Sequence, residues 1–201
     1  MRKGITVLLL ILIFSGISAM FWFSEWKYNL PTPVPAGYHL VKPGDTVNMP
    51  PVIGFANNKP VFLHFFNPDC PCSKFNIPHF KSLVKKYGDK VSFAVVAVCT
   101  DKKYTETAIQ EKFGLAIPVL FDSSIAIACG VYSTPQAALI GINHKLYYRG
   151  NYNKSRYCSD TKSEYAQMAI DSLLSNHTRP VFEAAAIKSY GCSLPGCKKP
   201  S

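Results

Sequence analysis

The sequence predicts an α/β fold with a central mixed sheet, preceded by one N-terminal transmembrane helix. Three observations lead to this prediction. Short apolar runs alternate with segments of helical periodicity, two late strands flank a turn, and residues 4–24 carry no charge. The chain has 201 residues, of which 48% are hydrophobic, so one domain with a substantial core is expected besides the helix.

The folded part is predicted to begin with strands and helices in alternation and to end with a hairpin and a helix. Predicted strands cover 61–66, 91–98, 119–121, 137–142 and 146–149, and predicted helices cover 73–87, 104–113, 123–128 and 163–174. The run 91–98 (VSFAVVAV) has the β-branched composition of a strand that is buried on both faces. This order implies a mixed sheet covered by helices on both sides.

The N-terminal segment is predicted to be an uncleaved membrane anchor. Arg2 and Lys3 precede the apolar run, which is long enough to span a hydrocarbon core of roughly 30 Å. Trp22 and Trp26 resemble an interfacial aromatic belt, and the positive-inside rule exports everything that follows. A cleavable signal peptide is the alternative, because residues 16–18 (GIS) would suit a cleavage site. Either segment places the domain outside the cytoplasm.

The chain is expected to have four parts. Residues 1–24 form the anchor, 25–59 a Pro-rich linker, 60–180 the folded domain, and 181–201 a tail that contains cysteines. The net charge of +10 is spread over single basic residues and pairs, without a nucleic-acid motif. We therefore expect a solvated basic surface and no nucleic-acid partner.

The residues with the clearest chemistry are Cys70 and Cys72, in the segment Asp69-Cys70-Pro71-Cys72, where the first core strand gives way to a helix. A helix N-terminus stabilises a thiolate, which is the nucleophile in thiol–disulfide exchange. Two other interpretations stay open. The pair could pack inertly in the core, or it could bind copper or another thiophilic metal.

These motifs resemble the thioredoxin superfamily and, within it, the bacterial membrane-anchored branch of redoxins and thiol–disulfide oxidoreductases. The resemblance rests on the strand 61–66, Cys70-Pro71, a helix containing Pro78, Thr134-Pro135 before a strand, and Tyr148-Arg149-Gly150. It implies a thioredoxin-like three-layer fold. It also implies that Pro135 is a cis proline facing the cysteines and that the backbone of Thr134 pairs with a substrate. The implied location is the bacterial inner membrane, single-pass, with the domain in the periplasm.

This sequence departs from the family in having Cys-Pro-Cys in place of Cys-x-x-Cys, so two alignments are open. Either Cys70 is the nucleophile and Cys72 resolves the mixed disulfide, or Asp69 stands at the usual nucleophile position. We favour Cys70, because it precedes the helix. Asp69 is a candidate substrate-binding residue that would either disfavour a thiolate or cap the helix.

The remaining cysteines are candidate accessory thiols, except Cys129, for which core packing is expected. Cys99 follows a strand at the edge where active sites of open sheets gather. In an exported protein, Cys192 and Cys197 are expected to bridge to each other, or one of them to Cys158.

The leading function is that of a membrane-tethered thiol–disulfide oxidoreductase, without a cofactor, acting on exported proteins or small thiols. Its expected partners are a protein substrate with a thiol or disulfide and a membrane or periplasmic electron partner. Two alternatives use the same cysteines: a metal-handling protein and a peroxiredoxin-like peroxidase. Peroxiredoxins have threonine three residues before their cysteine, where this chain has Asn67.

Overall fold

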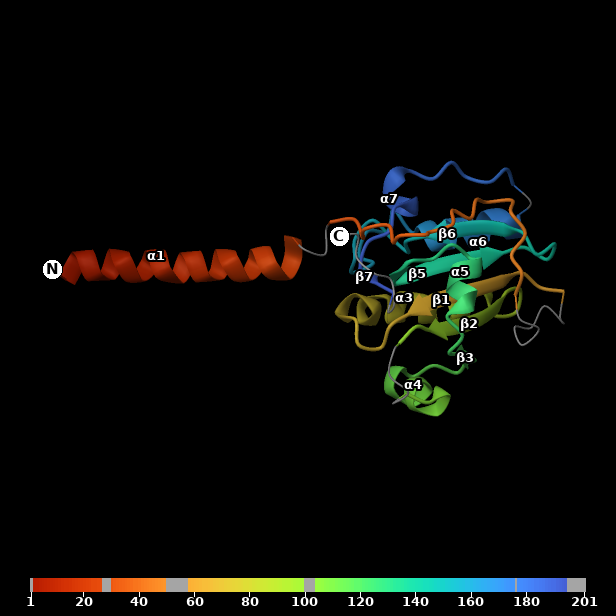
Figure 1. The fold of residues 1–201 in the computed structure, drawn as a ribbon, viewed down its shortest axis with the longest axis horizontal. Helices are drawn as coiled ribbons and strands as arrows, with labels where there is room; N and C mark the ends of the chain where they lie inside the picture. Colours follow the sequence, from red (N-terminus) through yellow and green to blue (C-terminus); the bar gives the residue numbers. More distant parts are fainter. Residues whose placement is uncertain (1, 27–29, 50–57, 100–103, 176, 195–201) are drawn as a thin grey trace. The chain divides into compact units, whose positions relative to one another are not determined.

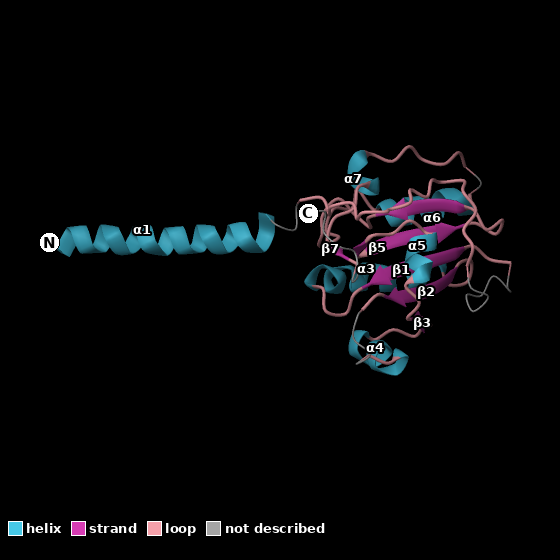
Figure 2. Ribbon diagram, viewed as in Figure 1, coloured by secondary structure: helices cyan, strands magenta, loops and turns pink. Residues whose placement is uncertain are grey.

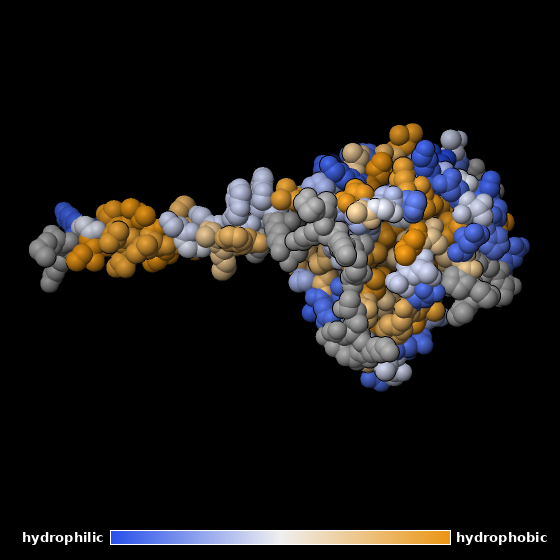
Figure 3. Space-filling model, viewed as in Figure 1, coloured by the Kyte–Doolittle hydropathy of each residue, from blue (hydrophilic) through white to orange (hydrophobic). Residues whose placement is uncertain are grey.

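The computed structural model describes residues 2–26, 30–49, 58–99, 104–175 and 177–194. The chain divides into two compact units, Met1–Pro31 and Thr32–Ser201. The first unit contains helix α1 (Arg2–Phe21) and a short π-helical segment η1 (Trp22–Trp26) (Figure 1). Over Lys3–Phe21 the mean hydropathy is 2.4, enough for a membrane span. Apolar side chains cover much of the face of α1 seen in Figure 3, which fits a single-pass anchor or a signal sequence.

The second unit is built on a five-stranded mixed sheet with the order β3-β2-β1-β5-β6. Its central strand β1 (Val61–Phe66) pairs in parallel with β2 (Ser92–Ala97) and antiparallel with β5 (Gln136–Ile140). The edges are β3 (Val119–Leu120), parallel to β2, and β6 (Leu146–Gly150), antiparallel to β5. The mixed sheet is therefore confirmed.

Helices cover both faces of this sheet (Figure 2). One face packs against α3 (Pro71–Tyr87), α4 (Glu106–Phe113) and α6 (Tyr165–Leu174). The other face packs against α5 (Ser124–Ala128). The three-layer thioredoxin-like fold that the sequence predicts is confirmed, and each predicted strand and helix of this unit overlaps an observed element.

Side-chain alternation along β1 separates two apolar clusters. Phe62 and Phe66 point to the α3 side, and Val61, Leu63 and Phe65 point to the α5 side, all with 0% exposure. Burial on both sides explains why the strand has no polar face, with His64 as its single titratable residue. The sheet is thus a rigid platform for the loop that follows β1.

Parts of the expected linker and tail belong to the folded unit. Thr32 is 6% exposed and Val47 is 2% exposed, and Val47 packs in the cluster on the α5 face. Residues 50–57 of the expected linker lie outside the described residues. Near the C-terminus, the chain forms α7 (Ala184–Ile187) and β7 (Cys192–Ser193). Strand β7 pairs antiparallel with β4 (Ser133–Thr134) in a second, two-stranded sheet.

Candidate active site

The site is centred on the loop between β1 and α3. Cys70 is the N-cap residue of α3, and Pro71 occupies the first turn, where its missing N–H removes no helical hydrogen bond. The Cys70 N–H donates to the carbonyl of Asn67 at 3.1 Å, and the Ser73 N–H donates to the carbonyl of Cys70 at 3.1 Å. These bonds hold Cys70 at the positive end of α3, a position that favours a thiolate when the cysteine is reduced.

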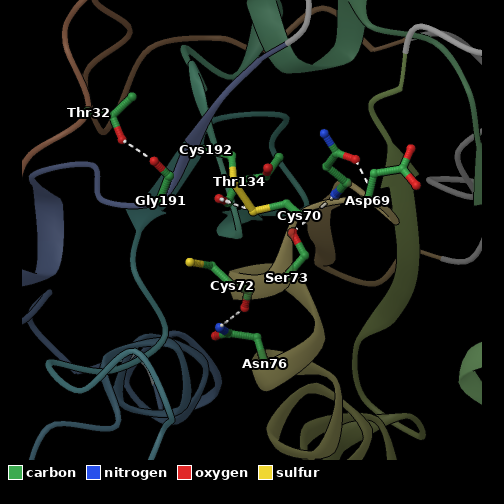
Figure 4. Close-up of a disulfide and its surroundings, with 10 residues drawn as sticks. Thr32, Asp69, Cys70, Cys72, Ser73, Asn76, Thr134, Gly191 and Cys192 are labelled. Carbon is green, nitrogen blue, oxygen red and sulfur yellow. Dashed lines mark hydrogen bonds between the residues drawn. A yellow bond between two sulfur atoms is a disulfide. The ribbon is translucent and has the colours of Figure 1, made fainter. Parts of the chain in front are cut away.

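Cys70 is joined to Cys192 by a disulfide across 122 residues of sequence (Figure 4). The S–S distance is 2.08 Å, and the Cα–Cα distance of 6.4 Å lies within the usual range for this bond. Cys70 is only 3% exposed, so this half of the bridge is shielded, whereas Cys192 is partly exposed. Its Sγ also lies 3.9 Å from the carbonyl oxygen of Thr134.

This pairing corrects the prediction for Cys192, which was expected to bond Cys158 or Cys197. The prediction was wrong because it paired Cys192 with cysteines of the C-terminal part of the chain. In the structure the tail pairs with β4, and this pairing places Cys192 beside Cys70. Cys197 lies outside the described residues. Cys158 has a thiol that donates to Asn76 Oδ1 at 3.1 Å.

Cys72 is not the partner of Cys70 in this structure. It lies in the first turn of α3, it is 4% exposed, and its side chain points away from the disulfide (Figure 4). Residues two apart on a helix point in different directions, which explains the separation. The Cys72 carbonyl accepts from Asn76 Nδ2 at 3.3 Å. Asn76 therefore links the start of α3 to the loop that holds Cys158.

The peptide bond between Thr134 and Pro135 is cis, as the resemblance implies. Thr134 is completely buried and comes from β4, immediately before the core strand β5. In the register of the small sheet, Ser133 lies opposite Ser193 and Thr134 lies opposite Cys192. The backbone that the resemblance assigns to a substrate is thus covered by the tail of the same chain.

Asp69 does not cap α3, contrary to one of the two expectations for it. The cap position belongs to Cys70, and the hydroxyl of Tyr104 donates to Asp69 Oδ1 at 2.6 Å. The Asp69 N–H in turn donates to Asn67 Oδ1 at 2.9 Å. The Asp69 carboxylate therefore connects the loop after β1 to Tyr104, two residues before α4.

Two other cysteines occupy different environments. Cys99 follows β2 and is half-buried, and because β1 and β2 are parallel it lies at the same edge of the sheet as Cys70. Cys129 is completely buried in the cluster on the α5 face, and burial raises the pKa of its thiol to about 12. Core packing of Cys129 is thus confirmed. The pKa of Cys158 is also raised to about 12, first by burial and then by the charge of Glu164.

The sequence did not reveal the residues that hold the tail in place. Gln136 Nε2 donates to Ser189 Oγ at 2.6 Å, and the Thr32 N–H donates to the Ser189 carbonyl at 2.8 Å. Thr32 Oγ1 also donates to the carbonyl of Gly191 at 3.2 Å (Figure 4). No local sequence pattern relates these residues to Cys70, because Cys192 lies 122 residues away along the chain.

Within the described ranges, no three His, Cys, Asp or Glu side chains gather in a way that could hold a metal ion. Cys70 is engaged with Cys192 and Cys72 points elsewhere. In this oxidised form, Cys70 and Cys72 are therefore not arranged to bind one metal ion together.

Solved structures share the fold at low sequence identity. An uncharacterised conserved protein of Geobacillus kaustophilus is 23% identical, with a TM-score of 0.63 over 86% of this chain and 100% of the other. A hypothetical protein of Sinorhizobium meliloti 1021 is 17% identical, with a TM-score of 0.62 over 81% and 97%. A peroxidoxin of Mycobacterium tuberculosis is 18% identical, with a TM-score of 0.51 over 69% and 100%. These likenesses show the fold alone.

Sequence comparison gives the family. Among curated proteins, no relative matches the chain. A family model described as a domain of unknown function, DUF6436, matches residues 44–194, which is more than half of the chain. The match begins just before the buried Val47 and ends at Leu194, so it includes Cys70, Thr134 and Cys192. The protein is a member of the DUF6436 family, with a thioredoxin-like fold.

Proposed function

We propose that this chain is a membrane-tethered thiol–disulfide oxidoreductase of the periplasm whose reactive couple is Cys70 and Cys192. One observation carries the proposal: the disulfide joins the N-cap cysteine of α3 to a strand that lies against the cis Thr134–Pro135 backbone. A merely structural bridge needs neither a helix N-terminus nor a cis-proline neighbour. A redox centre uses the first to favour a thiolate.

The reaction balances with two cysteines and no cofactor. The thiolate of Cys70 attacks a partner disulfide, forms a mixed disulfide and releases one partner thiolate. Cys192, as a thiolate, then attacks Cys70 Sγ, closes the bridge seen in the structure and releases the second partner thiol. The partner gains two electrons, and an external dithiol must reduce the protein again. Run in reverse, the same steps oxidise partner thiols.

Cys72 was predicted as the resolving thiol, and the proposal replaces it with Cys192. Burial of Cys72 and the direction of its side chain support this replacement. Cys99 and Cys158 remain candidate accessory thiols, and Cys72, which was predicted to be catalytic, joins them in this proposal. The variants Cys72→Ser and Cys192→Ser separate the two assignments. Each removes one sulfur atom, but only Cys192→Ser removes the disulfide partner of Cys70.

A second candidate, thiol peroxidase activity, is favoured by the likeness to the peroxidoxin and by the distant partner of Cys70. A peroxide would oxidise the Cys70 thiolate to a sulfenic acid and leave as an alcohol. Cys192 would then form the same disulfide with release of water. Consumption of hydroperoxide by the reduced protein, abolished by Cys70→Ser, would distinguish this reaction from exchange with disulfides.

The test is a redox titration of the full chain in detergent micelles. The protein is equilibrated with glutathione buffers, thiols are trapped by alkylation, and the bridges are mapped by mass spectrometry. We expect a reversible two-electron couple at Cys70–Cys192 that Cys72→Ser retains and Cys192→Ser abolishes. A couple below about −300 mV would identify a structural disulfide and refute the proposal, because such bonds resist reduction by the glutathione pool.

A further inference from the structure

The C-terminal strand fills the place that a partner would need. Cys192 lies opposite Thr134 in the antiparallel register, and the Leu194 N–H donates to the carbonyl of Tyr132 at 3.1 Å. The tail thus makes backbone contacts along the whole run Tyr132–Thr134 while its cysteine is bonded to Cys70. An extended polypeptide that formed a mixed disulfide with Cys70 would require the same backbone edge.

The tail also fills an apolar subsite two residues after its cysteine. Leu194 is 7% exposed and belongs to the cluster on the α5 face, with Val131 and Ile125. Beside it remains a hollow of about 370 Å³, which Ile127, Tyr132 and residues 35–39 also line. None of the lining residues is acidic or a lysine or arginine. This subsite accepts an apolar side chain. His39 also lines it, and the Arg149 guanidinium next to it donates to the Tyr38 hydroxyl and the Gly130 carbonyl.

The tail has a fixed end and a hinge. Ser189 is completely buried, and its hydroxyl and carbonyl accept hydrogen bonds from Gln136 and Thr32. Gly191 follows with φ +120°, and a Cβ there would lie 2.3 Å from the carbonyl oxygen of Thr134. The close approach explains why glycine is needed where the chain turns from its anchored end onto the strand.

We infer that Gly191–Leu194 is a tethered competitor of the partner, and that the partner is an extended polypeptide with an apolar residue two positions after its cysteine. This inference rests on the proposed exchange reaction and adds the recognition that precedes it. When the bridge is reduced, the tail swings from Gly191 and uncovers Cys70, the Thr134 backbone and the Leu194 subsite together. A partner then pairs with Thr134 and places its own apolar side chain where Leu194 was.

The partner class can be tested with peptide thiols on the full chain in micelles. The Cys192→Ser variant is first equilibrated with oxidised and reduced glutathione, so that Cys70 carries glutathione. A peptide with the sequence of residues 189–194 is then added, or a matched peptide with aspartate in place of its final leucine. In this exchange the peptide thiol displaces glutathione from Cys70, and mass spectrometry after proteolysis measures the occupancy of Cys70 by each thiol.

We expect the leucine peptide to have an exchange constant about tenfold or more above that of the aspartate peptide, because only leucine gains from burial in the subsite. Adding Leu194→Asp to Cys192→Ser should raise capture of the leucine peptide, since the chain's own strand then competes less well. Leu40→Asp is the matched control, because Leu40 is 59% exposed and lies outside the subsite.

Two failures are distinguishable. If Cys70 takes up neither glutathione nor peptide, the proposed exchange reaction is wrong. If glutathione adds normally but both peptides exchange equally, and Leu194→Asp changes nothing, then the exchange reaction stands and the tethered-competitor inference is refuted.

Discussion

Replacing Gly191 by alanine is expected to make the Cys70–Cys192 disulfide easier to reduce. Alanine at φ +120° would be held in a backbone region that L-residues rarely adopt, and its Cβ would lie 2.3 Å from the Thr134 oxygen. The neighbouring atom belongs to the backbone beside a core strand, so it has little freedom to move away. Held backbone strain of this kind costs about 1–3 kcal/mol.

In the proposed mechanism reduction releases the tail from Thr134, so that strain falls on the disulfide form, in which Gly191 lies against Thr134. For a two-electron couple about 30 mV corresponds to about 1.4 kcal/mol, so the potential should rise by roughly 20–60 mV. The exchange constant with glutathione should shift about 5- to 150-fold toward the reduced protein. The assay is the same redox titration of the full chain, with thermal unfolding of both redox forms measured in parallel.

Gly44→Ala is the matched control. Gly44 also has a positive φ, of +98°, but a Cβ there would meet no atom within 4 Å, and the residue lies outside the tail. We expect this variant to lose some stability in both redox forms and to keep its potential. An unchanged potential in Gly191→Ala would refute the reasoning, since it would mean that the tail stays docked with the same strain after reduction.

Three further predictions concern the body of the domain. Burial lowers the pKa of His64 to about 3, and Tyr152 is hydrogen-bonded to its Nδ1 at 2.7 Å. The stability that neutral His64 contributes is complete above about pH 6.5 and is lost as the pH falls toward about 3, with about 2 kcal/mol lost by pH 5. Urea unfolding at pH 7 and pH 5 should show this loss, and His64→Gln should reduce it; equal losses in both proteins would contradict it. Because burial raises the pKa of Cys129 and Cys158 to about 12, neither thiol should react with iodoacetamide at pH 8 until the protein unfolds, as peptide mapping would show. Rapid labelling of both thiols in the folded protein would show that they are not buried as described. Gly150→Ala should destabilise the domain by about 1–3 kcal/mol in denaturant titration, because its Cβ would lie 2.1 Å from the carbonyl oxygen of Ala186; a change below about 0.5 kcal/mol would count against the packing described.

Local information was sufficient for the elements of the fold. The strand β2 lies in the predicted VSFAVVAV run, and α3 begins at the predicted junction after β1, because hydrophobic periodicity and proline position act within a few residues. The cis Thr134–Pro135 bond agreed with the resemblance, which ties that dipeptide to the turn before a core strand. These features depend on neighbours in sequence or on motifs of the superfamily.

The sequence by itself determined the membrane-compatible helix, the thioredoxin-like sheet and the position of Cys70 at the start of α3. Tertiary structure alone decided which cysteine Cys70 bonds. Cys72 is two residues away, yet helical geometry points it elsewhere, while Cys192 is brought from 122 residues away by pairing with Thr134. A disulfide requires two sulfur atoms that lie close together with suitable geometry. Sequence spacing determines the distance between two cysteines only when both lie in the same helix, strand or turn.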